Sequence, residues 1–406
     1  MYGRRSDSAR MLKNKFMIRY TATPQELNTA VEHLHAAPEI SIDLEFDKNY
    51  YRYGFNLCLM QVMADSTCYL VDPLSDDIEI DRTFQPLENP KIPKTCFAFG
   101  EDIRLLHTLG CYPKNVLDLS LAANLLNYQP MSLTQLLIEV LGVRTGKAAQ
   151  MSNWYKRPLT GHQKQYAAED VMFLPELREQ LMDQAEKKGV TSWILEENQV
   201  WETEDFAGTG EVDYLKDKDR KGMSEMAWHL YTRLIEFREK IAQKKNMPSY
   251  KVIDKSFLRA VATKPGYVEV WHQERGVHPS LRNKNAGYEA QLLVEDSLEE
   301  ARELGLSDMK PAEKKLSKEK LASIKRYQNI IRHLKQEVFN PVKQQIGREY
   351  GENTAAFILN NRVIEAYVSE KPEEILPYRR ELIEHTAMSL GMHVEGSVDE
   401  AKRSNN

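Results

Sequence analysis

The segment ISIDLEF, residues 40–46, constrains the fold of this chain more than any other. Apolar and polar side chains alternate along it, which is the period of a β-strand rather than of a helix. The alternation places four apolar side chains on one face of the strand and Asp43 and Glu45 on the other. The chain must therefore build a sheet that buries one face of this strand and carries two adjacent carboxylates on the opposite face.

Four further runs have the composition of strands, and several segments have apolar residues at helical spacing. We expect strands at residues 15–20, 40–46, 56–63, 67–71 and 95–99. We expect helices at residues 23–36, 100–109, 117–126, 133–141 and 161–187. Early strands that form a meander, with later helices packed on them, are typical of an α/β domain, which we place at residues 16–201.

The 406 residues are too many for one ordinary core, so further domains are expected. Residues 202–222 have little apolar periodicity and predict a linker. Helical spacing without strand patterns resumes in residues 223–300 and, after a charged second linker at 301–325, in residues 326–395. Residues 396–406 are predicted to be a disordered tail.

Residues 1–15 are basic but lack the apolar run of a signal peptide, so we expect a flexible tail there. No stretch approaches the length of a membrane span, and we expect a cytoplasmic protein that binds no membrane. Its four cysteines have no metal-ligand spacing and are expected to be reduced, packed thiols. The net charge of −5 means that any nucleic-acid binding must use local basic patches.

Asp43 and Glu45 lie side by side on their predicted strand. Like charges this close are costly unless a cation neutralises them, and carboxylate oxygens suit Mg²⁺ or Mn²⁺. Asp102 lies in the first turn of the helix that follows the strand at 95–99. In TGHQKQYAAEDVMFL a capping box opens a helix, and Tyr166 and Asp170 lie one turn apart on the same face.

Each signal alone has a simple structural explanation: a solvated strand face, an acid that favours the helix dipole, or an ordinary surface helix. Together they supply four carboxylates and a tyrosine that could converge. Hydrolysis of a phosphodiester by two metals needs acidic oxygens to hold cations about 4 Å apart and a polar group to orient the attacking water. The sequence therefore predicts that the catalytic residues are Asp43, Glu45, Asp102, Tyr166 and Asp170, with the four carboxylates as metal ligands.

These segments resemble the ribonuclease D family, the tyrosine (DEDDy) branch of the DnaQ-like 3′–5′ exonucleases. Besides DLEF and YAAEDVMFL, the resemblance rests on LCLMQV, GEDIRLL, LDLSLAANLL and GKAAQMSNWYKRPLT. It implies a ribonuclease H-like mixed sheet with flanking helices. It also implies hydrolysis of RNA 3′ ends with two Mg²⁺ or Mn²⁺ ions, release of nucleoside 5′-monophosphates, and a role in maturing transfer RNA or other stable RNA.

Position by position, the resemblance implies that Asp43, Glu45 and Asp170 hold one metal. Asp43 and Asp102 would hold the second metal, mainly through water, and Tyr166 would orient the attacking water. These roles come from the family and not from the spacing of the residues.

Several positions indicate whether the chain resembles the histidine or the tyrosine branch of the superfamily, and some of them depart from the family motifs. The histidine branch has its base five residues before the last aspartate, where this chain has Gln165, so the tyrosine branch is favoured and His162 is expected on the surface. Asn153 stands where relatives commonly have aspartate, and Phe97 where many have histidine. Neither position is a metal ligand in the family, although substrate positioning could change. Asp118 resembles a family aspartate that is usually structural.

Residues 226–265 resemble the helicase-and-RNase-D C-terminal (HRDC) domain through LIEFREKIAQ and NMPSYKVI, and a fainter copy covers residues 334–383. The resemblance thus implies two all-α HRDC-like domains after the α/β domain. Cations of the first copy could contact a phosphate backbone, or could only solvate the helices. The leading candidates are Lys244, Lys245, Lys251 and Arg259.

Aromatic residues after the DxE motif could stack on terminal bases, because stacking tolerates any sequence, or could be core and rim packing. The candidates are Phe46, Tyr50, Tyr51, Tyr53 and Phe55. The expected partner is RNA with an accessible 3′ end, including transfer RNA precursors, and we expect a monomer. Two alternatives remain: a DNA 3′–5′ exonuclease with the same chemistry, and an inactive scaffold that binds RNA. The complete set of carboxylates and tyrosine argues against the scaffold.

Overall fold

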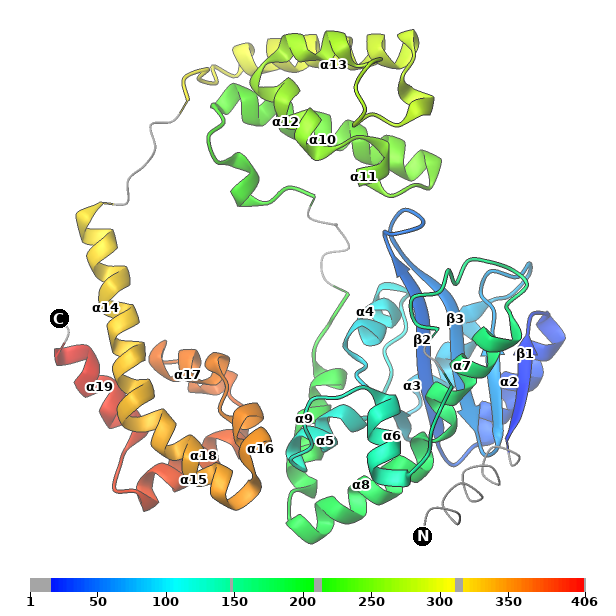
Figure 1. The fold of residues 1–406 in the computed structure, drawn as a ribbon, viewed down its shortest axis with the longest axis vertical. Helices are drawn as coiled ribbons and strands as arrows, with labels where there is room; N and C mark the ends of the chain where they lie inside the picture. The colour runs from blue at the N-terminus through cyan, green and yellow to red at the C-terminus, as the bar shows by residue number, and fades with distance from the viewer. Residues whose placement is uncertain (1–15, 147–148, 208–213, 311–316, 405–406) are drawn as a thin grey trace. The chain divides into compact units, whose positions relative to one another are not determined.

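The computed structural model describes residues 16–146, 149–207, 214–310 and 317–404. The predicted N-terminal tail at residues 1–15 lies outside the described residues, as do 208–213 and 311–316 of the predicted linkers and the last two residues of the predicted C-terminal tail. The chain forms two compact units (Figure 1). The sheet unit comprises Met1–Glu45, Cys58–Ala207 and Lys318–Asn406, and the helical unit comprises Phe46–Leu57 and Gly208–Ser317.

A six-stranded mixed sheet forms the centre of the α/β domain, in the order β1-β4-β3-β2-β5-β6. β1 pairs parallel with β4, β4 pairs antiparallel with β3, and β2, β5 and β6 run parallel to one another. The strands are β1 (Met17–Thr21), β2 (Ile40–Lys48), β3 (Phe55–Ala64), β4 (Thr67–Val71), β5 (Lys94–Cys96) and β6 (Val116–Asp118). The alternation in residues 40–46 therefore becomes β2, an interior strand with neighbours on both sides.

Helices flank this sheet, and α7 packs along it (Figure 1). They are α2 (Pro24–Ala36), α3 (Phe84–Glu88), α4 (Gly100–Thr108), α5 (Leu119–Leu125), α6 (Leu133–Leu141), α7 (Gly161–Met172), α8 (Leu174–Lys188) and α9 (Thr191–Thr203). The first helix begins at a capping box formed by Thr23 and Glu26. The four cysteines are buried as reduced thiols, as expected from the sequence.

Two predicted helices differ in the structure. Residues 117–126 were expected to be one helix, but β6 ends at Asp118, whose side chain accepts a hydrogen bond from the Ser120 amide and caps α5. The helix expected at 161–187 is interrupted at Phe173, because Pro175 stands at the second position of α8 and has no N–H to continue the ladder of α7.

The C-terminal helices belong to the same compact unit as the sheet and share one hydrophobic core with α5 and α8. They are α14 (Lys318–Leu334), a π-helical turn (Lys335–Phe339), α15 (Asn340–Tyr350), α16 (Glu352–Ile358), α17 (Asn361–Val368), α18 (Pro377–Ser389) and α19 (Val394–Ser404). The Trp193 ring of α9 stacks on Tyr378 with centroids 5.3 Å apart. Buried Arg379 donates from Nε to Glu197 of α9 at 2.5 Å. This region is therefore docked against the α/β domain.

The boundaries of that region differ from the prediction. Residues 396–404 were expected to be disordered, but they continue α19, which buries Val398 and Ala401 at 3% exposure each. The predicted linker at 301–325 includes the end of α13 and the start of α14. In α19 a short charged segment hides a few apolar side chains that pack at helical spacing, and composition alone does not reveal them.

The helical unit contains α10 (Glu225–Lys245), α11 (Ser249–Val252), α12 (Lys255–Thr263) and α13 (Lys284–Glu303). Its core surrounds Trp271, whose indole N–H donates to the Leu281 carbonyl at 2.9 Å. The tip of the β2–β3 hairpin belongs to this unit. There the Tyr53 amide donates to the Asn246 side chain at 3.3 Å, and the Tyr53 ring stacks on Tyr214. Among the described residues, no helix combines the length and apolarity needed to cross a membrane.

Candidate active site

Three of the predicted carboxylates meet at one place on the sheet unit. Asp43 and Glu45 come from β2 and Asp170 from α7. Each offers an oxygen, and these oxygens all lie within 4.8 Å of one another. Two segments more than a hundred residues apart in the chain thus bring acidic oxygens to a spacing at which one cation can bind them together.

Asp102 joins this group from a third segment. It lies in the first turn of α4 and is 7% exposed. Its Oδ1 accepts a hydrogen bond of 3.1 Å from the amide of Leu44, the residue between Asp43 and Glu45. The carboxylate of Asp102 is therefore tied to the strand that carries the first two acids.

Asp118 fixes the turn from which α4 begins. Its carboxylate accepts hydrogen bonds from the amides of Ala98 at 2.8 Å, Phe99 at 2.9 Å and Ser120 at 2.8 Å. Ala98 has a φ of 54°, in the left-handed region that a residue other than glycine seldom adopts, so this turn needs an external hold. Both oxygens of Asp118 are engaged in holding the backbone, and Asp102 follows this turn directly.

Tyr166 lies one turn before Asp170 on α7, and its ring is 6.3 Å from the ring of Trp154. The loop before α7 is fastened to the sheet by Arg157. One terminal nitrogen of Arg157 donates to the Asp72 carboxylate at 2.7 Å and to the Cys58 carbonyl at 2.8 Å. This anchor holds the segment that leads into α7 and therefore the position of Tyr166 and Asp170.

Sequence reasoning missed the pair of Arg157 and Asp72. The arginine lies in the RPL motif that carried the family resemblance, but its partner is 85 residues away in the chain. One available signal was Asp72 itself, an acid that directly follows the apolar strand β4 and is 1% exposed. A buried acid needs either a cation or hydrogen-bond donors to offset its loss of hydration, and here Arg157 supplies both.

Burial, and after it the charge of neighbouring carboxylates, raises the pKa values of the acids at this site. Burial raises the pKa of Asp43 to about 7, and burial together with the charge of Asp43 raises the pKa of Asp170 to about 8. The pKa values of Glu45 and Asp102 are also well above their ordinary range, first because of burial and then because of neighbouring carboxylates. Oxygens that repel one another in this way are the donor set that a hard divalent cation stabilises.

The pKa of Tyr166 is raised by burial and then by the charges of Asp170, Glu45 and Asp43. The phenol therefore stays protonated near neutral pH. It can donate or accept a hydrogen bond at the cluster.

The structure separates the predicted aromatic candidates into packed and exposed residues. Phe46 packs edge to face on Phe55 with ring centroids 5.2 Å apart, and Tyr53 stacks on Tyr214. Tyr50 and Tyr51 are 61% and 37% exposed.

The predicted cations also differ in their surroundings. Lys244, Lys245 and Lys251 are exposed. The guanidinium of Arg259 donates to the backbone carbonyls of Asp219 and Lys221, so it holds the start of the helical unit together.

The structure also shows the surroundings of the residues that distinguish the branches of the superfamily or depart from the family pattern. His162 is exposed, and the Gln165 amide donates to Glu169 at 2.8 Å. The Asn153 side chain accepts a hydrogen bond from the Tyr155 amide, which is a local turn contact, and Phe97 packs against the core.

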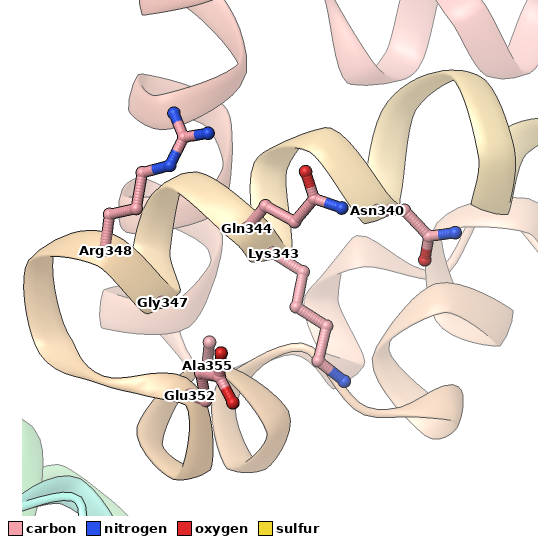
Figure 2. Close-up of a pocket in the computed structure, with 7 residues that line it drawn as sticks. All are labelled: Asn340, Lys343, Gln344, Gly347, Arg348, Glu352 and Ala355. Atoms are coloured by element: carbon pink, nitrogen blue, oxygen red, sulfur yellow. The ribbon is translucent and has the colours of Figure 1, made fainter.

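A cavity of about 600 Å³ lies elsewhere, between α15 and α16 (Figure 2). Its lining residues are Asn340, Lys343, Gln344, Gly347, Arg348, Glu352 and Ala355. The lining offers two cations and a single acid. It therefore lacks the set of acidic oxygens that the cluster on β2 and α7 provides, and we assign the chemistry to that cluster.

A family model described as 3′–5′ exonuclease matches residues 18–186. A ribonuclease D from Gluconacetobacter diazotrophicus is 28% identical over 65% of this chain and 68% of its own length. A ribonuclease D from Granulibacter bethesdensis is 28% identical over 70% of this chain and 72% of its own length. The chain is similar to ribonuclease D over about two thirds of its length. These matches confirm the resemblance to ribonuclease D that the sequence motifs indicate.

Solved structures show that the ribonuclease D fold extends along the chain. RNase D from Escherichia coli has a TM-score of 0.67 at 21% identity, covering 95% of this chain and 99% of that one. The catalytic core of RRP6 from Trypanosoma brucei has a TM-score of 0.57 at 22% identity, covering 70% of this chain and 81% of that one. These similarities confirm the predicted ribonuclease H-like sheet with flanking helices and a helical C-terminal region.

Proposed function

We propose that this chain is a metal-dependent 3′–5′ exoribonuclease of the ribonuclease D family, whose chemistry takes place at Asp43, Glu45, Asp102, Tyr166 and Asp170. The observation that carries the proposal is the convergence of acidic oxygens from β2, α4 and α7. The matched exonuclease model covers all of these residues, and the relatives that match are named ribonuclease D.

The donor set fits Mg²⁺ or Mn²⁺, because it consists of carboxylate oxygens, which these hard cations prefer. Asp43, Glu45 and Asp170 would hold one ion, and Asp43 with Asp102 would hold the second. Bound ions of this kind lower the pKa of a water and neutralise charge on the leaving oxygen.

The protein's own part of the reaction is positioning. Tyr166 keeps its proton and offers its hydroxyl to orient the attacking water beside Asp170. Asp118 and Arg157 hold the two backbone segments from which Asp102, Tyr166 and Asp170 project. Cleavage at the last phosphodiester releases a nucleoside 5′-monophosphate and leaves a new 3′ hydroxyl for the next cycle.

The test is degradation of matched single-stranded RNA and DNA oligonucleotides carrying a label at the 5′ end. We expect RNA to shorten stepwise from its 3′ end with divalent metal and to remain intact with a chelator. Equal or faster shortening of DNA would favour the DNA exonuclease alternative. Binding of RNA without any shortening would favour the inactive scaffold.

We further propose that its substrates include transfer RNA precursors and that it acts as a monomer. A transfer RNA with a 3′ extension should lose the extension and then resist further trimming. Product mapping of that reaction separates maturation from general degradation, because general degradation would continue into the mature transfer RNA.

A further inference from the structure

The loop at the tip of the β2–β3 hairpin is held in one shape by Asp47, which is 5% exposed. The Asp47 carboxylate accepts hydrogen bonds from the amides of Tyr50 at 3.1 Å, Tyr51 at 3.1 Å and Arg52 at 2.9 Å. The negative charge of Asp47 is therefore buried against backbone N–H groups and is not exposed at the surface of the loop. The loop consequently presents the rings of Tyr50 and Tyr51, which meet edge to face 4.8 Å apart.

Helix α11 of the helical unit brings a second set of side chains to this loop. Lys251 donates from Nζ to the Tyr50 carbonyl at 2.8 Å. The same ammonium lies 5.3 Å from the Tyr50 ring centroid and 5.6 Å from that of Tyr250. Tyr250 is 53% exposed, and its hydroxyl also reaches the Tyr50 carbonyl, at 3.3 Å. Segments 200 residues apart therefore build one surface, the tyrosine–lysine patch of Tyr50, Tyr51, Tyr250 and Lys251.

This combination suits a strand of unpaired nucleotides. Exposed aromatic rings stack on bases of any sequence, and an ammonium among them meets the phosphate backbone. Two further exposed lysines, Lys244 and Lys245, end α10 directly before Asn246, which binds the hairpin at Tyr53. Bases in a duplex are stacked within it and do not offer their faces to such rings, so single-stranded RNA is the form that fits.

We propose that the tyrosine–lysine patch binds a single-stranded segment of the substrate upstream of the 3′ end that is being trimmed. This proposal rests on the proposed function, since a 3′ end held at the carboxylates leaves only upstream nucleotides for any other contact. The strand that carries Asp43 and Glu45 continues directly into the loop that carries Tyr50 and Tyr51.

The test compares two labelled RNAs with the same 3′ sequence, one of about four nucleotides and one of about 20. In the full chain of 406 residues, Tyr50→Ala with Tyr250→Ala should raise KM for the long RNA roughly tenfold or more, because two stacking faces are lost. The kcat on both RNAs and the KM for the short RNA should stay unchanged. The backbone carbonyl of Tyr50 that binds Lys251 is retained in this variant.

Salt dependence distinguishes the two kinds of contact. Lys251→Gln should make the slope of log affinity against log salt concentration less steep by about 0.7, the value for one phosphate contact on a single strand. The double tyrosine variant should leave that slope unchanged. Matched controls are Tyr288→Ala and Lys284→Gln, which remove an exposed tyrosine and an exposed lysine on α13.

Substitution of both tyrosines by phenylalanine checks that the loop stays folded, and it should restore binding of the long RNA. The proposed binding of RNA by the patch is refuted if the double variant Tyr50→Ala with Tyr250→Ala binds the long RNA as the wild type does. It is refuted equally if Tyr288→Ala weakens binding as much as the double variant. It is also refuted if the short RNA loses affinity as much as the long one. Failure of the wild type to shorten any RNA would instead refute the proposed function, and the binding comparison would still decide on the patch.

Discussion

At the scale of single residues, Asp43 and Asp170 are acids whose pKa values in the folded chain are raised by burial to about 7 and about 8. In the unfolded chain an aspartate has a pKa of about 4. The folded state therefore binds more protons between these values, and its stability falls as the pH rises from about 4 through about 8. A bound divalent cation removes this penalty.

We predict that the melting temperature of the metal-free protein falls between about pH 5 and about pH 8.5, and that Mn²⁺ raises it more at the higher pH. Asp170→Asn removes one of the ionising groups and should flatten the pH dependence relative to the wild type. Thermal unfolding followed by circular dichroism at several pH values provides the comparison. A wild-type curve no steeper than that of the variant would contradict the assignment of these pKa shifts.

Tyr166 gives a second prediction at this scale. Tyr166→Phe keeps the ring that packs beside Trp154 and removes the hydroxyl. Loss of one hydrogen bond to the attacking water should lower kcat roughly 10- to 100-fold and leave KM nearly unchanged. Steady-state kinetics on a short RNA measures both constants. An unchanged kcat would show that the hydroxyl has no part in the reaction.

Local pattern was enough to predict on which face of its strand or helix each of these residues lies. Asp43 and Glu45 are set by strand alternation, and Tyr166 and Asp170 by the helical period, so both pairs could be placed before any tertiary contact was known. The nucleic-acid candidates were less predictable. Phe46 was a candidate either for base stacking or for packing, and the structure shows it beside Phe55, a neighbour that alternation along one strand does not specify.

At the scale of elements, the turn between β5 and α4 determines where Asp102 lies. Asp118 holds that turn through the amides of Ala98 and Phe99, and it caps α5 through the amide of Ser120. Asp118→Ala should lower the free energy of unfolding by about 2–4 kcal/mol, because these amides lose a charged acceptor. Asp118→Asn keeps one acceptor oxygen and should lose less.

Chemical denaturation measures the stability of both variants, and titration with Mn²⁺ reports whether Asp102 has moved. We expect weaker metal binding in Asp118→Ala, even though Asp118 is not proposed as a ligand. If both stability and metal affinity stayed at wild-type values, the turn would not depend on this side chain.

The elements with strong periodicity were predicted well, including β2, β4, α2 and α6. The weaker predictions failed where one residue decides the boundary, as at Asp118, which caps a new helix, and at Phe173, which separates α7 from α8. Tails and linkers were predicted from their high content of charged residues. That composition did not reveal the buried apolar side chains of α19.

At the scale of the whole molecule, the sequence predicted separate domains along the chain, whereas the last helices share the core of the α/β domain. The contact between Arg379 and Glu197 joins residues 182 positions apart, and no local pattern reports such a pair. Truncation after α9 would expose the rings and acids that this region covers. Assays of RNA binding should therefore use the full chain rather than the isolated nuclease domain.

The docking predicts a specific sensitivity at Gly351, which begins α16 with a φ of 98°. A Cβ atom there would lie 2.1 Å from Cγ of Asn127, at the end of α5. Gly351→Ala should lower the free energy of unfolding by about 2–4 kcal/mol through overpacking and backbone strain. The control is Gly391→Ala, where φ is also positive but the added Cβ meets no atom within 4 Å.

The control Gly391→Ala should lower the free energy of unfolding by only about 1–2 kcal/mol, the cost of the backbone strain. Urea unfolding of the two variants beside the wild type separates these contributions. Equal losses in both variants would mean that the approach of Gly351 to Asn127 contributes nothing to the docking of the C-terminal helices.

The proposed activity depends above all on acidic oxygens from β2, α4 and α7 acting on the 3′ end of RNA through divalent metal. Its most direct test is product mapping of a 5′-labelled RNA incubated with wild type, Asp43→Asn and Asp170→Asn, each with and without Mg²⁺. We predict stepwise 3′ shortening by the wild type with metal only, and no shortening by either variant, although both fold and bind the RNA. Metal-dependent 3′ shortening by either variant at the wild-type rate would contradict the account.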